Sequence, residues 1–420
     1  MDTFTPSRLT LARMRRAIRQ QELAERCSVD ARTVRAWEKG EWPPDEGSLQ
    51  NLVRVLRFPR SFFFAPAIEL IDLDTASFRS LTTLRAAQRD AVHAAGTLTI
   101  PLHEWIKARF RLPKLDVPSL RDLSPELAAA AVRTEWGLGD GVAPNMVHLL
   151  EYHGVRVFSA YEEVREFDAF SFWADGHAFV MLNTLKSAER GRFDAAHELG
   201  HLVLHRDGSV HGPEAEQQAD RFASAFLLPE KGIAAQRPRS PSLKTVLVMK
   251  GQWQVSVAAM AHRLSRLGYL SEWQYREMVI EIQRRGWRTS EPEPMKKRET
   301  SQVLAKVFGP LRREDETPQS VAREIHLPVD EVQRMVFGLV LTDAPPADAL
   351  PAPPPAPPKS AWKPRIVRSS QDDAREDSWA PPAAPTDAGD RSGASSSRGF
   401  DLTFDACVTP DSDNDAASSA

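Results

Sequence analysis

The spacing of apolar positions near the N-terminus predicts a group of short helices over residues 8–64. Apolar residues recur at helical intervals in residues 20–26 and again in residues 30–39, where Asp30 stands at the expected cap position. Gly40 follows as the type of residue that commonly ends a helix. Ser28 and Val29 form a short turn between the two helices. This arrangement predicts a helix-turn-helix.

Apolar runs in the middle of the chain predict a small β-sheet. Strands are expected at residues 154–158, 167–173 and 177–183. Asp175 and Gly176 separate the last two, and this dipeptide is a strong signal for a tight hairpin. We expect the strand at 177–183 to lie at an edge of the sheet, where an extended peptide could pair with it. A covered structural strand is the alternative.

The remaining apolar periodicity is helical. Residues 192–205 and 216–226 carry apolar side chains at steps of three to four, and residues 243–285 are predicted to be helical as well. Residues 317–329 imitate a second helix-turn-helix, but the sequence that follows has no basic face, so we interpret it as a packing element. The predicted fold class is therefore mainly α with a small β-sheet, an α+β protein.

Length and composition divide the 420 residues into several regions. The last part, from Asp343 on, is rich in Pro, Ala, Ser and Asp, and cannot bury enough apolar surface to fold, so it is predicted to be disordered. The expected regions are a helix-turn-helix bundle at 1–66, a helical connector at 67–124, a domain with the small sheet and the following helices at 125–290, a helical subdomain at 291–342 and the tail at 343–420.

Charge and cysteine content narrow the functional classes. The net charge is −3, but residues 1–60 hold twelve Lys and Arg against eight Asp and Glu, whereas residues 343–420 hold seven against thirteen. The two cysteines lie in different regions, which argues against a disulfide framework. No apolar run has the length of a membrane span, and no signal-peptide pattern opens the chain. We therefore expect a cytoplasmic protein with no membrane partner.

The sequence HELGH at residues 197–201 is the strongest chemical signal of the chain. On a helix, His197 and His201 lie one turn apart on the same face, so both imidazoles can bind one metal ion. Glu198 is placed to take a proton from a metal-bound water. Zinc would need a third protein ligand and one open position. Glu216 is our candidate for that ligand, and Zn²⁺ is the expected cofactor.

Nearby residues refine this prediction. Asp220 lies one helical turn after Glu216 and is expected to bind the second nitrogen of a ligand histidine, which fixes its orientation. The longer motif HExxHxxGxxH is excluded, because Leu204 and Asp207 occupy its Gly and His positions. His205 is about 12 Å along the helix from His197 and cannot share one ion with both other histidines. A buried structural helix with satisfied histidines is the alternative for HELGH.

Two segments resemble the ImmA/IrrE family of zinc metallopeptidases. RFDAAHELGHLVLH at 192–205 is close to the family signature, and EQQADRFASAFLLPE at 216–230 resembles the segment that supplies its third ligand. The resemblance implies that His197, His201 and Glu216 are the zinc ligands and Glu198 the catalytic base. His177 and Tyr161 are candidates for stabilising the oxyanion.

A further segment, RQQELAERCSVDARTVRAWEKG at 19–40, resembles the helix-turn-helix of Xre/Cro-type repressors. Ser28 stands where that family usually has a glycine, and would need a positive φ. The resemblance implies that the third helix enters the major groove of double-stranded DNA. The expected DNA-contacting residues are Gln20, Arg32, Thr33, Arg35 and Lys39.

Together, these predictions describe a transcriptional regulator that binds DNA as a homodimer and carries a zinc-dependent endopeptidase domain. Its expected substrate is a regulatory protein such as a repressor. One alternative is a transcription factor, or a toxin–antitoxin component, whose zinc site is structural or sensory. A helical protein–protein module is the alternative for residues 1–66.

Overall fold

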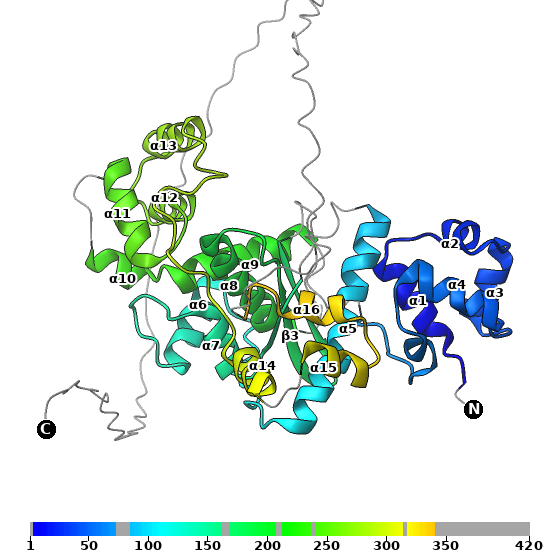
Figure 1. Ribbon diagram of the computed structural model, residues 1–420. Coiled ribbons are helices and arrows are strands. Elements are labelled where there is room, and N and C mark those ends of the chain that lie inside the picture. The colour runs from blue at the N-terminus through cyan, green and yellow to red at the C-terminus, as the bar shows by residue number, and fades with distance from the viewer. Residues whose placement is uncertain are drawn as a thin grey trace, which may run out of the picture. The chain divides into compact units, whose positions relative to one another are not determined.

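The computed structural model describes residues 3–72, 85–160, 168–206, 212–236, 241–313 and 317–340. These residues are mainly helical with one three-stranded sheet, so the predicted fold class is confirmed (Figure 1). The tail predicted from residue 343 lies outside them. No helix among them has the length and apolar character needed to cross a membrane.

The helices and strands follow one another along the chain in this order: α1 (Pro6–Arg15), α2 (Gln20–Cys27), α3 (Ala31–Lys39), α4 (Glu46–Leu56), the 3₁₀ helix η1 (Arg60–Phe64), α5 (Ala86–Arg109), α6 (Pro125–Glu135), α7 (Met146–Tyr152), β1 (Arg156–Ser159), β2 (Ala169–Ala174), β3 (His177–Leu182), α8 (Ala188–Leu204), α9 (Gly212–Leu227), α10 (Glu230–Ala235), α11 (Leu243–Trp253), α12 (Val257–Arg266), α13 (Glu272–Arg284), α14 (Gln302–Arg313), α15 (Pro318–Glu324) and α16 (Val329–Val336).

The predicted helix-turn-helix is present as α2 and α3. Ser28 between them has φ 58°, the positive value that this turn requires of a residue other than glycine. Asp30 caps α3 by accepting a hydrogen bond from the backbone N–H of Arg32, and Gly40 ends the helix at φ 73°. Leu23 and Trp37 are buried between the helices.

The strand order of the sheet is β1–β3–β2, with β3 parallel to β1 and antiparallel to β2. The prediction that residues 177–183 form an edge strand is therefore wrong, because β3 is the central strand. Residues Ala178 to Leu182 of this strand are all buried, as in a strand whose two faces are both covered. The predicted Asp175–Gly176 hairpin is present, and both of its residues have positive φ.

Helices α8 and α9 lie side by side next to the sheet (Figure 1). Their close approach depends on Gly200, because a Cβ at this position would lie 3.1 Å from the Phe222 side chain and 3.2 Å from the Cα of Ala219. A larger residue would push the helices apart. Gly200 thus allows residues of α9 to face the histidines of α8.

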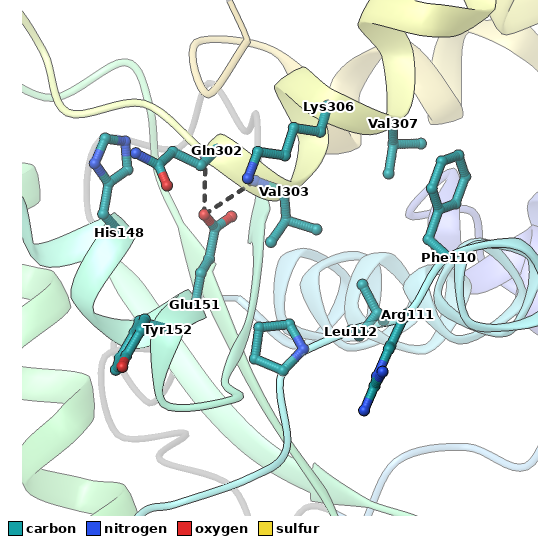
Figure 2. A pocket seen from close by; sticks show the side chains of 11 residues that line it. Phe110, Arg111, Leu112, His148, Glu151, Tyr152, Gln302, Val303, Lys306 and Val307 are labelled. Atoms are coloured by element: carbon teal, nitrogen blue, oxygen red, sulfur yellow. Dashed lines mark hydrogen bonds between the residues drawn. The ribbon is translucent and has the colours of Figure 1, made fainter.

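The segment after α13 is bound to the centre of the fold through α7. Glu151 of α7 is buried, and its carboxylate accepts hydrogen bonds from the backbone N–H groups of Gln302 and Val303 at the start of α14 (Figure 2). The Ser301 hydroxyl also donates to it. Burial raises the pKa of Glu151, while these donors lower it. Glu151 therefore caps α14, and the neighbouring cavity of about 290 Å³ carries no part of the site described below.

Helix α16 contacts the first helix of the chain through charged groups. Glu331 accepts hydrogen bonds from Arg15 at 2.7 Å and from Arg16 at 2.6 Å, and its side chain is 2% exposed. Burial raises the pKa of Glu331, but the two arginines lower it by a larger amount, so the net shift is downward. The residues that imitate a second helix-turn-helix thus end in a buried ion-pair network.

Candidate functional site

The structure brings together the three residues that the sequence analysis named as metal ligands. His197 and His201 come from adjacent turns of α8, and Glu216 comes from α9. One ligand atom from each lies within 4.8 Å of the others. The histidines face this point with their Nε2 atoms, which are 3.1 Å apart. Glu216 places its carboxylate oxygens 3.4 Å from Nε2 of His197 and 3.6 Å from Nε2 of His201.

These separations fit a tetrahedral zinc ion. With zinc–ligand bonds of about 2.0–2.1 Å, two ligand atoms at tetrahedral corners lie about 3.3–3.4 Å apart. The three observed distances, 3.1, 3.4 and 3.6 Å, lie on either side of that value. A zinc ion would fit with little movement of the side chains. Two nitrogens and one carboxylate oxygen are also ligands that zinc prefers, and they leave a fourth corner for water.

Asp220 holds the ring nitrogen of His197 that faces away from this point. Nδ1 of His197 lies 2.9 Å from the Asp220 carboxylate. Such a contact keeps a proton on Nδ1, so Nε2 is the nitrogen that a metal would bind. Burial disfavours the charged ring, yet Asp220 and Glu216 outweigh it and raise the pKa of His197 to about 10. The site therefore attracts a positive charge.

Glu198 is a residue of α8, and its side chain is buried where this helix packs against the sheet. Its carboxylate accepts a hydrogen bond of 2.7 Å from the Ser171 hydroxyl of β2, and both residues are almost inaccessible to solvent. This bond orients the glutamate from the side of the sheet. The sequence analysis did not identify Ser171, because its role depends on the packing of β2 against α8, and an isolated serine in a strand gives no signal.

His201 is held by a chain of side chains. Its Nδ1 lies 3.0 Å from Nδ1 of His205, and Nε2 of His205 lies 3.0 Å from Oε1 of Gln218. The Gln218 amide group in turn donates to Glu214 at 3.3 Å. The helical spacing of the histidines was visible in the sequence, whereas Gln218 was missed, because its contact with His205 depends on how α9 packs against α8.

Two adjoining cavities surround these groups. The smaller has a volume of about 150 Å³, and its lining includes His197, Glu198, Glu216 and Asp220, together with Asp168 and Asp194. The larger has a volume of about 690 Å³ and extends from α8 and α9 to α12. Arg190, Phe193 and Asp220 line both cavities, so the two lie next to each other. A polypeptide segment could therefore reach the metal-binding point from the larger cavity.

His177 does not lie at this site. It pairs with Ala174, whereas the site adjoins Ala169 at the other end of β2. Its ring instead packs 4.9 Å from that of His103. The prediction that His177 stabilises the oxyanion is therefore wrong, because the hairpin between β2 and β3 places His177 at the end of the sheet away from Ala169. The other candidate, Tyr161, lies outside the described residues.

The predicted DNA-contacting residues lie on α2 and α3. Arg32, Arg35 and Lys39 are exposed, and Thr33 is half-buried. The amide group of Gln20 donates to Glu38 at 2.5 Å, so this side chain is bound within the helix pair. The three exposed basic side chains follow one another at helical spacing and extend from one helix.

Residues 150–265 match the sequence model of the Peptidase_M78 family, described as an IrrE N-terminal-like domain. The matched segment runs from α7 into α12 and contains the HELGH helix, Glu216 and Asp220. This match supports a metallopeptidase-type domain in the middle of the chain. A comparison with curated proteins finds no match.

Proposed function

We propose that this protein is a zinc-dependent endopeptidase whose metal ligands are His197, His201 and Glu216. The near-tetrahedral spacing of these ligands is the observation that carries the proposal. The buried Glu198 on the same helix and the match to a peptidase family support it. The domain that carries this activity is proposed to span residues 125–290, because α6 packs against both α8 and α9.

The chemistry follows from the position of each side chain. When bound, zinc lowers the pKa of its water towards ~7 and polarises the scissile carbonyl group. Glu198 accepts the proton of the attacking water and delivers it to the leaving amine. The hydrogen bond from Ser171 keeps the Glu198 carboxylate in a fixed orientation during both transfers. Asp220 and His205 orient the two ligand rings.

Metal analysis of the purified protein tests this proposal. We expect about one zinc ion per chain. His197→Ala combined with His201→Ala should bind almost none, whereas the control His262→Ala, which alters a histidine outside the ligand set, should bind as much as the parent. Equal zinc content in the parent and the double variant would place the metal elsewhere and contradict the proposal.

We further propose that the N-terminal helices make the protein a transcriptional regulator. The turn at Ser28, the cap at Asp30 and the exposed Arg32 and Arg35 of α3 support binding of this helix in the major groove of double-stranded DNA. One small module reads few base pairs, so tight binding is expected to need a homodimer on two half-sites. The proposed substrate is another regulatory protein, such as a repressor, whose cleavage would alter transcription.

A non-proteolytic role for the same site remains the alternative. In a transcription factor or toxin–antitoxin component with a structural or sensory metal, zinc would bind but no protein would be cut. The buried Glu198, which follows a ligand histidine on α8, supports the peptidase, because a purely structural site needs no such carboxylate.

A further inference from the structure

The larger cavity beside the metal site carries an excess of unpaired arginines. Five arginines line it, and two of them, Arg190 and Arg221, form ion pairs with carboxylates. Within the described residues, Arg263, Arg266 and Arg288 have no carboxylate at ion-pair distance. Three of the five arginines in this wall are therefore without an ion pair to any described carboxylate.

The carboxylates in the wall of the cavity are already occupied. Glu126 binds Arg221 at 2.8 Å, and Asp220 binds His197 at 2.9 Å. Glu189 and Glu291 share the buried Lys250, at 3.7 Å and 3.1 Å. None of these groups lies at ion-pair distance from Arg263, Arg266 or Arg288. An anionic ligand in this cavity would therefore meet three arginines that have no carboxylate of the described residues at ion-pair distance.

Arg263 shows this most clearly, because its side chain is buried. The residue is 6% exposed, and its Nε donates to the carbonyl oxygen of Leu228 at 2.9 Å. Burial lowers its pKa, and the more distant Glu126 and Glu230 offset this only in part. A buried guanidinium without a carboxylate partner is unfavourable. A carboxylate from a ligand could form the two-pronged contact that arginine favours.

We infer that this arginine-lined cavity binds an acidic stretch of the polypeptide substrate, next to the bond that is cut. The inference rests on the proposed peptidase function and names the class of its substrate: segments with Asp or Glu a few residues from the scissile bond. Because Arg190, Phe193 and Asp220 border both cavities, one extended peptide can occupy both. Tyr275 and Trp287 provide apolar contact surface for the same segment.

Nucleic acid is the other anionic polymer to consider. Helix α12 follows α11 through Gln254, whose φ of 57° matches that of Ser28 in the first helix-turn-helix. However, Arg263 is buried and lines a cavity that adjoins the metal site, and a peptide carboxylate can reach a buried guanidinium more readily than the phosphates of a duplex can. The binding experiment with peptides and a DNA duplex distinguishes binding of DNA in this cavity from binding of an acidic peptide.

The binding test uses the full-length Glu198→Gln protein loaded with zinc, so that bound peptides stay intact. The probes are fluorescein-labelled peptides of one length that carry glutamate, glutamine or lysine at the same positions, and a labelled DNA duplex. Fluorescence anisotropy should show the glutamate peptide binding roughly tenfold tighter than the glutamine peptide. The change Arg266→Gln with Arg288→Gln should remove most of this difference. Arg276→Gln, an exposed arginine of α13 outside the cavity, is the matched control and should leave it unchanged.

Several results would overturn the inference. Equal affinity for the glutamate and glutamine peptides would do so, as would equal losses in the double variant and in Arg276→Gln. DNA binding that depends on Arg266 and Arg288 and that the glutamate peptide cannot displace would assign the arginines to nucleic acid instead.

A cleavage experiment separates this inference from the function on which it rests. The wild-type protein is incubated with a mixed peptide library, and the new ends are mapped by mass spectrometry. Cleavage with Asp or Glu enriched at a fixed distance from the cut supports both. Cleavage without that enrichment refutes the acidic preference and retains the peptidase. Selective binding of the glutamate peptide without any cleavage retains the acidic binding site and refutes the peptidase.

Discussion

The Nδ1 atoms of His201 and His205 lie 3.0 Å apart, on the side of the His201 ring opposite to the metal-binding point. If Nε2 of His201 binds a metal, its Nδ1 carries the proton and donates it to His205. His205 then holds its own proton on Nε2, where the carbonyl oxygen of Gln218 accepts it at 3.0 Å. The contact between the Gln218 amide group and Glu214 fixes the orientation of that side chain. All four groups therefore favour the same tautomer of His201, the one that binds metal.

The variant Gln218→Leu should weaken zinc binding by about tenfold, because His205 loses its acceptor and no longer fixes the His201 ring. Gln218→Glu keeps an acceptor and should retain affinity at least equal to that of the parent. Competition with a chromophoric chelator measures the zinc affinity of both variants. Gln217→Leu, an exposed neighbour on α9, is the control. Equal affinity in Gln218→Leu and the control would show that His201 needs no such support.

Asp220 performs the corresponding role for His197. Asp220→Ala should lower zinc affinity about tenfold, the lower end of the usual range of 10–100-fold for such partners. A moderate effect is expected because the Asp220 side chain is 61% exposed and water can replace it in part. Asp220→Asn keeps an acceptor oxygen and should lose less. The same chelator competition decides, and an equal loss in both variants would exclude an orienting hydrogen bond.

The network at Glu331 predicts a stability that depends on pH. The pKa of this carboxylate is lowered from its ordinary value of 4.5, so its contribution is present above that value and is lost as the pH falls through the folded-state pKa. Glu331→Gln should cost about 3 kcal/mol of unfolding free energy near neutral pH, because two arginines lose their buried partner. The difference from the parent should shrink below a pH of about 4.

Chemical denaturation at neutral pH and at acidic pH measures the difference in unfolding free energy between Glu331→Gln and the parent. Asp330→Asn is the control, because Asp330 lies 3.8 Å from Arg16 and is more exposed than Glu331. A difference that stays constant between neutral and acidic pH would show that the carboxylate charge of Glu331 does not stabilise the fold.

The parts of the site that the sequence revealed are those fixed by local geometry. The spacing of His197 and His201 follows from the helical repeat, and the resemblance between residues 216–230 and a known family indicated Glu216. Ser171 and Gln218 were not predictable, because they reach the site through contacts between separate elements. The order of the strands was also beyond the sequence. A hairpin signal pairs β2 with β3, but gives no indication that β1 lies on the other side of β3.

The N-terminal helices yield a prediction about DNA. Arg32→Ala and Arg35→Ala should each cost roughly 1–3 kcal/mol of binding free energy and relax specificity at one base pair, if the arginine contacts guanine. Lys39→Ala should instead weaken binding to all sequences, as loss of a phosphate contact would. Binding-site selection at two salt concentrations distinguishes these effects. An unchanged base preference in both arginine variants would mean that α3 does not read the sequence.

The most direct test of the central claim compares the zinc-loaded parent with zinc-loaded Glu198→Gln. Both proteins are first shown to contain the same amount of zinc, and each is then incubated with the same peptide library for analysis by mass spectrometry. We expect new peptide ends with the parent and none above background with Glu198→Gln, because the variant keeps the metal ligands and loses the base. Equal cleavage by the two proteins, or no cleavage by either, would contradict the assignment of a zinc peptidase to this site.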